Sequence, residues 1–211
     1  MSLFSKLHGS NEEPAAPKNA ATLSEAEVAV LMNPAALNEE SPAVFKARFE
    51  TTAGGFVIEV TRAWAPVGAD RFYNLVKSNF FTGAAFFRYV PGFIVQWGIS
   101  ADPRIAAAWR SANISDDKFN RSNSRGTVTF ATAGPGTRTT QFFVNFKDNS
   151  FLDSQGFTPF GAVVEGMDVV QRLYSGYGEK PDQGLLQTQG RAYVEAKFPK
   201  LDSITSATIL A

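Results

Sequence analysis

The sequence predicts a mainly β protein whose strands form a closed β-barrel with helices over its ends. Three observations carry this prediction. Short stretches of alternating apolar and polar residues recur along the chain, Gly-containing turns separate several of them, and only a few segments have helical periodicity. Many short strands with few helices are typical of a sheet that closes on itself.

The first 42 residues differ in character from the rest. Residues 9–21 are polar and contain two prolines, which is typical of a flexible leader. Thr22 and Glu25 have the spacing of a capping box, and the short helix that they predict should end before Pro34. We therefore expect a leader with a short N-terminal helical extension over 1–42 and one barrel domain over 43–211.

A β-hairpin is predicted at the start of the barrel domain. Apolar residues alternate with polar ones from Phe45 to Phe49 and again from Phe56 to Val60, and a Gly-rich turn joins the two runs. Similar short runs predict further strands over residues 85–89, 93–97, 127–131, 141–145, 159–164 and 204–210.

Helices are predicted at three places in this domain. One should begin near Pro66, because proline is favoured at the first helical position and apolar residues follow at helical spacing. A second fits residues 168–174 and is closed by Gly176. A third, shorter helix fits residues 192–198.

Composition excludes several classes of function. The 20 basic and 20 acidic residues balance, so no strong field favours a nucleic acid or an anionic membrane surface as partner. The chain has no Cys, and its only histidine, His8, lies in the polar leader, which argues against a catalytic triad or a His-based metal site. We expect no metal and no cofactor.

The expected state is a monomer that is not membrane-bound. No apolar run approaches the length of a transmembrane helix, and residues 1–7 hold too few large apolar residues for a signal peptide. A cytoplasmic location is the expectation, with an export signal removed from a longer precursor as the alternative.

Three segments set polar side chains among aromatic ones. The first, 86–98, surrounds Arg88 and Gln96 with apolar residues, and a half-buried guanidinium in such surroundings needs an acceptor. Strand alternation places Arg88 on the same face as Phe86, and Gln96 on the same face as Ile94. Taken alone, Arg88 is more simply interpreted as a solvent-exposed residue on an edge strand.

The other two segments have ordinary structural interpretations when taken singly. Segment 130–144 runs from small residues into a Gly-Pro turn and on to Gln141 and two Phe, which indicates a hairpin between barrel strands. Segment 151–161 indicates a loop with exposed aromatic residues.

Together the three segments resemble the cyclophilin family. The motifs Phe-x-Arg…Pro-Gly-Phe…Gln-x-Gly, Ala-Gly-Pro…Gln-Phe-Phe and Leu-Asp…Phe-Gly occur in the family's order and at nearly its spacing. The resemblance covers residues 45–210 and implies an eight-stranded antiparallel barrel with two main α-helices. It also implies a peptidyl-prolyl cis/trans isomerase with an external groove for proline-containing peptides and, in many members, cyclosporin.

The resemblance assigns roles to individual residues. Arg88 matches the family's catalytic arginine, and Gln96 and Gln141 match the polar groups that hold the peptide backbone and orient that arginine. The substrate-binding positions that it implies are Phe93, Ile94, Ala131, Thr132, Gln141, Phe143, Phe151, Leu152 and Phe157. Four of these match the walls of the proline pocket: Phe93, Ile94, Phe143 and Leu152. Gatekeepers of a neighbouring subsite fall at Thr137, Arg138 and Thr140.

The chain also departs from the family pattern. Phe87 and Phe157 stand where many members have His, so imidazole acid-base chemistry is not required if this isomerase works. Phe151 replaces the Trp usual in cyclosporin-sensitive members, which predicts reduced cyclosporin affinity because the indole donor is lost. Thr132 stands where Asn is common, and residues 99–125 depart most.

The expected partners are proline-containing peptides and folding polypeptides. The main rival function is a binding module that holds proline-rich segments without catalysis. Arg88, Gln96 and Gln141 occurring together favour the enzyme, because a binder needs no charge directed into its groove. A hydrolase or metalloenzyme has almost no support without a His or Cys in the barrel domain.

Overall fold

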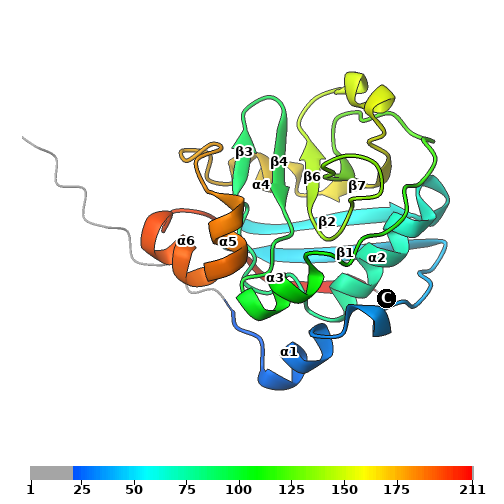
Figure 1. Ribbon diagram of the computed structural model, residues 1–211. Helices are drawn as coiled ribbons and strands as arrows, with labels where there is room; N and C mark the ends of the chain where they lie inside the picture. The colour runs from blue at the N-terminus through cyan, green and yellow to red at the C-terminus, as the bar shows by residue number, and fades with distance from the viewer. Residues whose placement is uncertain (1–20, 211) are drawn as a thin grey trace, which may run out of the picture.

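The computed structural model describes residues 21–210 of the chain. Residues 1–20 of the expected leader, which include His8, lie outside the described residues. Figure 1 shows a strongly curled sheet with helices packed around it. Among residues 21–210, no helix is both long and apolar enough to cross a membrane.

Eight strands form one antiparallel sheet, as the resemblance implied. The strands are β1 (Val44–Thr51), β2 (Gly54–Thr61), β3 (Arg88–Val90), β4 (Ile94–Trp97), β5 (Thr127–Phe130), β6 (Phe142–Asn145), β7 (Pro159–Glu165) and β8 (Ile204–Leu210). Their order across the sheet is β3-β4-β6-β5-β7-β2-β1-β8, and every neighbouring pair is antiparallel.

The two edges of this sheet meet through the residues that precede β3. Ala85 and Ser203 form an isolated antiparallel bridge. The backbone N–H of Phe86 donates to the carbonyl of Asp202 at 3.0 Å, and that of Ile204 donates to Ala84 at 2.9 Å. These bonds join the β3 side to the β8 side, so the sheet curls into a barrel.

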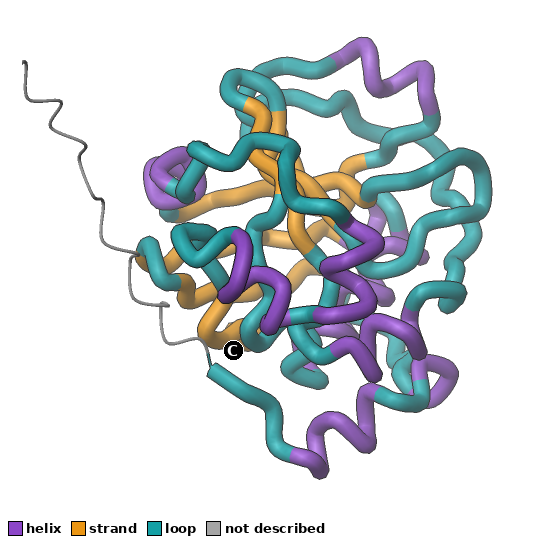
Figure 2. The backbone as a smooth tube through the Cα atoms, turned by 60° about the vertical axis from the view of Figure 1, so that its left-hand side comes forward, coloured by secondary structure: helices purple, strands orange, loops and turns teal. Residues whose placement is uncertain are grey.

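The helices lie outside the sheet (Figure 2). They are α1 (Glu25–Leu31), α2 (Pro66–Lys77), α3 (Pro103–Trp109), α4 (Met167–Arg172), α5 (Gln183–Gln189) and α6 (Arg191–Lys197), with three 3-10 turns at Pro34–Ala36, Arg62–Trp64 and Ser150–Gln155. The expected helices correspond to α1, α2, α4 and α6. Helix α4 ends before the predicted boundary because Leu173 adopts an extended backbone.

The N-terminal helix begins at a different cap from the one predicted. Its capping box joins Ser24 and Glu27, not Thr22 and Glu25. The Ser24 N–H donates to the Glu27 carboxylate at 2.8 Å, and the Ser24 hydroxyl accepts from the Glu27 N–H. The helix packs on the domain, because Leu31 is buried and its carbonyl accepts a hydrogen bond from the Trp109 indole at 2.8 Å.

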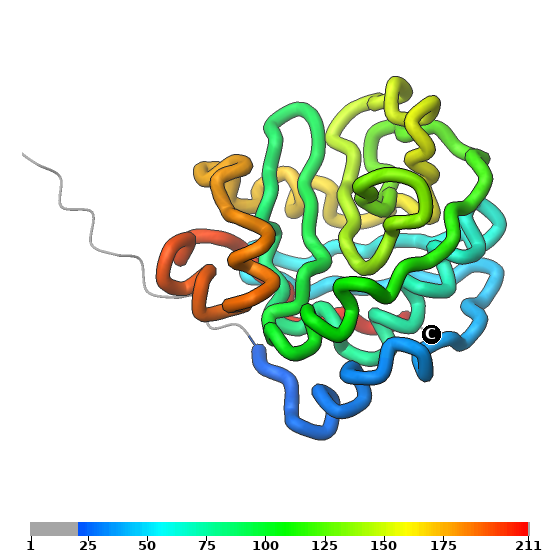
Figure 3. Tube along the Cα trace, viewed as in Figure 1, coloured from blue at the N-terminus to red at the C-terminus, as the bar shows by residue number. Residues whose placement is uncertain are grey.

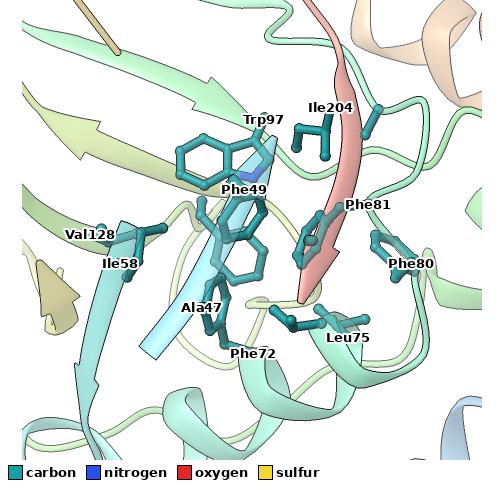
Figure 4. Close-up of a cluster of buried hydrophobic side chains, with 14 of the residues drawn as sticks. Ala47, Phe49, Ile58, Phe72, Leu75, Phe80, Phe81, Trp97, Val128 and Ile204 are labelled. Atoms are coloured by element: carbon teal, nitrogen blue, oxygen red, sulfur yellow. The ribbon is translucent and has the colours of Figure 1, made fainter. Parts of the chain in front are cut away.

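Aromatic side chains fill the barrel (Figure 4). Alternation in β1 buries Phe45, Ala47 and Phe49, as the pattern predicted. The ring of Phe49 stacks on Phe56 at 5.1 Å between centroids, and Phe72 of α2 contacts Phe49 at 6.0 Å. Burying a side chain as large as Phe contributes about 1.5–3 kcal/mol, so this core stabilises the scaffold that carries the outer groove.

Candidate active site

The β3–β4 hairpin positions the two residues with the clearest predicted roles. Arg88 of β3 lies directly opposite Gln96 of β4 in the register of this pair. Alternation in β4 directs Val95 and Trp97 into the core and leaves Gln96 on the opposite face. The expectation that Phe86 shares the face of Arg88 is wrong, because β3 begins only at Arg88 and Phe86 turns into the core.

A chain of polar contacts runs along the floor of the site. Arg88 Nη1 donates to Gln96 Oε1 at 3.1 Å, and Gln96 Nε2 donates to Gln141 Oε1 at 2.8 Å. Gln96 is buried, whereas the Arg88 side chain remains 29% exposed. Because Gln96 is buried and bonds to the partly buried Gln141, these two amides have few alternative rotamers and form a fixed platform for the guanidinium.

A carboxylate also holds Arg88. Its Nε donates to Glu179 Oε1 at 2.7 Å, and its Nη2 lies 2.7 Å from the same oxygen. The loop that carries Glu179 is fixed to β3, because the Tyr89 N–H donates to the Gly178 carbonyl at 3.1 Å. Sequence reasoning missed Glu179, which lies far from every motif; only the tertiary fold reveals the contact.

An apolar pocket adjoins this platform. Ile94, Phe143 and Leu152 form a separate buried cluster, and Phe93, Ala131 and Phe157 pack against it. The rings of Phe143 and Phe157 meet edge-on at 5.7 Å between centroids. We refer to these six residues as the apolar pocket. They come from three strand ends and one loop that are distant in the sequence.

The platform and the apolar pocket open into one groove of about 470 Å³. The predicted site residues that line it are Arg88, Phe93, Ile94, Gln96, Ala131, Thr132, Gln141, Phe143, Leu152 and Phe157. Phe151 is the exception: it lies outside the groove lining, is 54% exposed and stacks on Phe93 at 5.9 Å. The fold therefore gathers ten of the eleven predicted residues around one groove and places the eleventh beside it.

Further residues line the same groove without having been predicted. Ala133 and Thr139 extend the wall formed by the 131–141 segment, and Arg110, Gln183 and Gln187 come from helices α3 and α5. Figure 3 follows residues 99–125, coloured green, from β4 through α3 and around the outside of the sheet to β5. Helices α3 and α5 have only seven residues each and leave little periodic signal, which is why these residues went unnoticed.

The loop that carries Leu152 is fixed by Asp153. Its carboxylate accepts from the Ser122 hydroxyl at 2.7 Å, from the Asn123 N–H at 2.9 Å and from Asn123 Nδ2 at 2.8 Å. The same amide nitrogen donates to the Phe157 carbonyl at 2.9 Å. Burial alone would raise the pKa of the Asp153 carboxyl, but the bonds from Ser122 and Asn123 outweigh it and lower that pKa.

The three gatekeeper positions have different surroundings. Thr137 lines the groove. Thr140 is buried and donates to the Gly98 carbonyl at 2.7 Å. Arg138 is also buried and pairs at 3.0 Å with Asp117, whose carboxylate accepts the first N–H groups of α2 from Val67 and Gly68. Only Thr137 is thus placed to meet a ligand in the groove, while the other two anchor its wall.

The groove suits ligand binding and hydrogen-bond donation. Its lining residues include no His, Cys, Asp or Glu, so it offers no nucleophile paired with a base. Within residues 21–210, no three potential ligands of the His, Cys, Asp or Glu type lie close enough together to hold a metal ion. The site instead combines a fixed guanidinium, amide groups and an apolar pocket.

Known proteins with this sequence pattern act on proline peptide bonds. Residues 46–189 match the family described as cyclophilin type peptidyl-prolyl cis-trans isomerase/CLD. A peptidyl-prolyl cis-trans isomerase of Acinetobacter baylyi is 33% identical over 152 residues, which cover 69% of this chain and 80% of that protein. Peptidyl-prolyl cis-trans isomerase A of Dickeya dadantii is 37% identical over 129 residues, or 58% of this chain and 67% of that protein.

Solved structures share the fold. A cyclophilin type peptidyl-prolyl cis-trans isomerase of Cryptosporidium parvum matches with a TM-score of 0.61 at 20% identity, over 80% of this chain and 98% of that chain. The structure of the same protein in the presence of the dipeptide Ala-Pro matches with a TM-score of 0.60, over 79% of this chain and 99% of that chain. Since the family match extends over most of the barrel and includes both walls of the groove, the chain belongs to the cyclophilin-type peptidyl-prolyl cis-trans isomerases.

Proposed function

We propose that Arg88 accelerates X-Pro rotation by donating a hydrogen bond to the prolyl nitrogen as the amide leaves planarity. The observation that carries this proposal is the position of the guanidinium. Gln96 holds it at 3.1 Å, and both residues line the groove that also contains the apolar pocket. A proline ring seated in that pocket brings its nitrogen to the guanidinium.

The chemistry follows from the origin of the barrier. Resonance makes the X-Pro bond planar and gives a rotational barrier of ~18–20 kcal/mol. Twisting removes that resonance and leaves a more amine-like nitrogen that accepts a hydrogen bond. A donor directed at this nitrogen stabilises the twisted form and not the planar one, so it lowers the barrier.

The required stabilisation is within reach of these side chains. An acceleration of about a thousand- to ten-thousandfold corresponds to ~4–5.5 kcal/mol. A charge-assisted hydrogen bond contributes ~1.5–3 kcal/mol, and preorganised donors in partly dry sites reach ~3–4 kcal/mol. Arg88 then supplies most of the effect, and fixation of the ring by Phe93, Ile94, Phe143 and Leu152 supplies the rest. No bond is broken, so no nucleophile is required.

The proposed substrates are proline-containing peptides and folding polypeptides. The groove is open to solvent, and its Gln96, Gln141, Ala131 and Thr132 offer groups for a peptide backbone. The related Cryptosporidium parvum structure with Ala-Pro supports a dipeptide of this kind as the minimal ligand. Cyclosporin is proposed as a weak ligand, because Phe151 has no indole N–H to donate.

An NMR exchange experiment tests this function against pure peptide binding. The peptide contains one Ala-Pro bond, and the cis and trans signals are followed with and without the full-length protein. We expect exchange on the millisecond timescale in the presence of protein, compared with tens of seconds or longer without it. Shifted signals whose exchange stays slow would identify a binding module instead.

A further inference from the structure

The groove extends beyond the apolar pocket into a part built by two helices outside the barrel. Arg110 is the C-terminal cap of α3, and Gln183 and Gln187 lie one turn apart on α5. With Thr139 they form what we call the polar end of the groove. None of these four residues belongs to the apolar pocket.

A second, smaller cavity lies next to the polar end of the groove. It adjoins the groove through four shared residues, namely Arg110, Thr139, Gln141 and Gln187, and no residue of the apolar pocket lines it. Gln141 lines both cavities and also accepts the hydrogen bond from Gln96. Because both parts line one groove, a peptide with its proline in the apolar pocket can place another of its residues at the polar end.

Apolar packing between helices holds the polar end in place. Ala106 of α3, Leu186 of α5 and Tyr193 of α6 belong to a second buried apolar cluster. Ala106 lies one turn before Arg110, and Leu186 is next to Gln187. The Arg191 N–H also donates to the Ala101 carbonyl at 2.9 Å, which ties the α5–α6 junction to the start of α3. This packing fixes the backbone from which these polar side chains extend.

The charge at the polar end has no ion-pair partner among residues 21–210. Arg88 is paired with Glu179, and Arg138 is paired with Asp117. Arg110 is exposed and forms no ion pair with any residue from 21 to 210. No Asp or Glu lines the groove, while the two glutamines and Thr139 add neutral hydrogen-bonding groups. This combination complements a carboxylate and repels a cation.

We propose that the polar end is a subsite that selects peptides with an Asp or Glu side chain near the proline. The proposal rests on the proposed function, because it requires the proline to occupy the apolar pocket. Arg110 provides the charge, and Gln183 and Gln187 orient the carboxylate through their amide groups. Because the arginine is exposed, the selectivity is moderate and is weakened by salt.

A peptide series on the full-length protein tests the subsite. Peptides with one Ala-Pro bond carry Glu, Gln or Lys at one of the three positions that precede the Ala or of the three that follow the Pro, one position at a time. NMR gives the exchange rate of each peptide, and chemical-shift titration gives its Kd. At one position we expect Glu to exceed Lys by about three- to tenfold in kcat/KM and in affinity, with Gln between them.

Variants assign the effect to Arg110. Arg110→Gln should bring the Glu-to-Lys ratio close to one, and Arg110→Glu should invert it. Arg125→Gln is the matched control, because Arg125 is an exposed arginine outside the groove lining and should leave the ratio unchanged.

Two results would overturn the subsite: equal values for Glu and Lys at all positions of the wild type, or a preference that survives in Arg110→Gln. The affinity ratio is measured independently of turnover. Peptides that bind with the predicted ratio but show no accelerated exchange would contradict the isomerase mechanism and leave the subsite supported.

Discussion

Arg88 and Glu179 lie 91 residues apart in the chain and meet at 2.7 Å beside the groove. The guanidinium has five N–H donors in a planar fork. Glu179 accepts from Nε and contacts Nη2, and Gln96 accepts from Nη1, so three donors are engaged and one on each terminal nitrogen is left for a substrate. The ion pair therefore fixes the guanidinium and leaves two of its N–H donors for a substrate.

Glu179→Gln should slow catalysis more than it weakens binding. The neutral amide removes the charge that holds Arg88, while the apolar pocket that binds proline is unchanged. Because the Glu179 side chain is 58% exposed, we expect only a two- to fivefold decrease in kcat, that is, about the free energy of an exposed ion pair. Steady-state kinetics measure it, with the exposed Glu195→Gln as control. An unaltered kcat would mean that Gln96 alone positions the arginine.

Phe151→Trp should increase sensitivity to cyclosporin. The ring at this position stacks on Phe93 beside the groove and is exposed, so an indole fits without repacking the core. Its N–H adds one neutral hydrogen bond of ~0.5–1.5 kcal/mol, which corresponds to roughly a two- to tenfold lower Kd. Calorimetric titration of the two proteins measures this change. Equal Kd values would show that the Phe151 side chain does not determine cyclosporin affinity.

Asp153→Asn should destabilise the protein in a pH-dependent manner. The carboxylate accepts three hydrogen bonds from Ser122 and Asn123, and a neutral amide replaces these charge-assisted bonds with weaker neutral ones, so we expect a loss of about 1–3 kcal/mol at pH 7. Urea unfolding of both proteins measures the difference between their free energies of unfolding.

The sign of the pH effect follows from the lowered pKa of Asp153. The stabilisation is complete above the unfolded-state pKa of about 3.9 and is lost as the pH falls through the lower folded-state value. The free energies of unfolding of the wild type and of Asp153→Asn should therefore show their full difference at pH 6 and become equal at low pH. A difference that remains constant down to pH 2 would contradict a role for the ionised carboxylate.

Alternation and turn residues predicted the barrel well because they are local signals. Each predicted strand has a counterpart, and Pro66 begins α2 as expected. Errors occurred where two local signals competed. The predicted helix cap was Thr22, whereas the actual cap is Ser24. Phe86 was assigned to the face of Arg88, but the strand starts two residues after Phe86.

Contacts between distant segments could not be predicted in the same way. Helix α3 has seven residues, and α5 is polar with Leu186 as its buried residue, so neither has the long apolar face that marks a helix in a sequence. Arg110, Gln183 and Gln187 reach the groove only because α3 and α5 pack against each other. Glu179 meets Arg88 for a similar reason: a loop docks on β3.

Arg88→Lys tests the central claim most directly, because lysine keeps the charge and removes the planar fork. The measurement is the cis/trans exchange rate of a saturating Ala-Pro peptide by NMR, together with its Kd. We predict a rate at least about tenfold below wild type, the loss expected from one charge-assisted hydrogen bond, with a much smaller change in Kd. An exchange rate equal to that of the wild type at full occupancy would contradict catalysis by the Arg88 guanidinium.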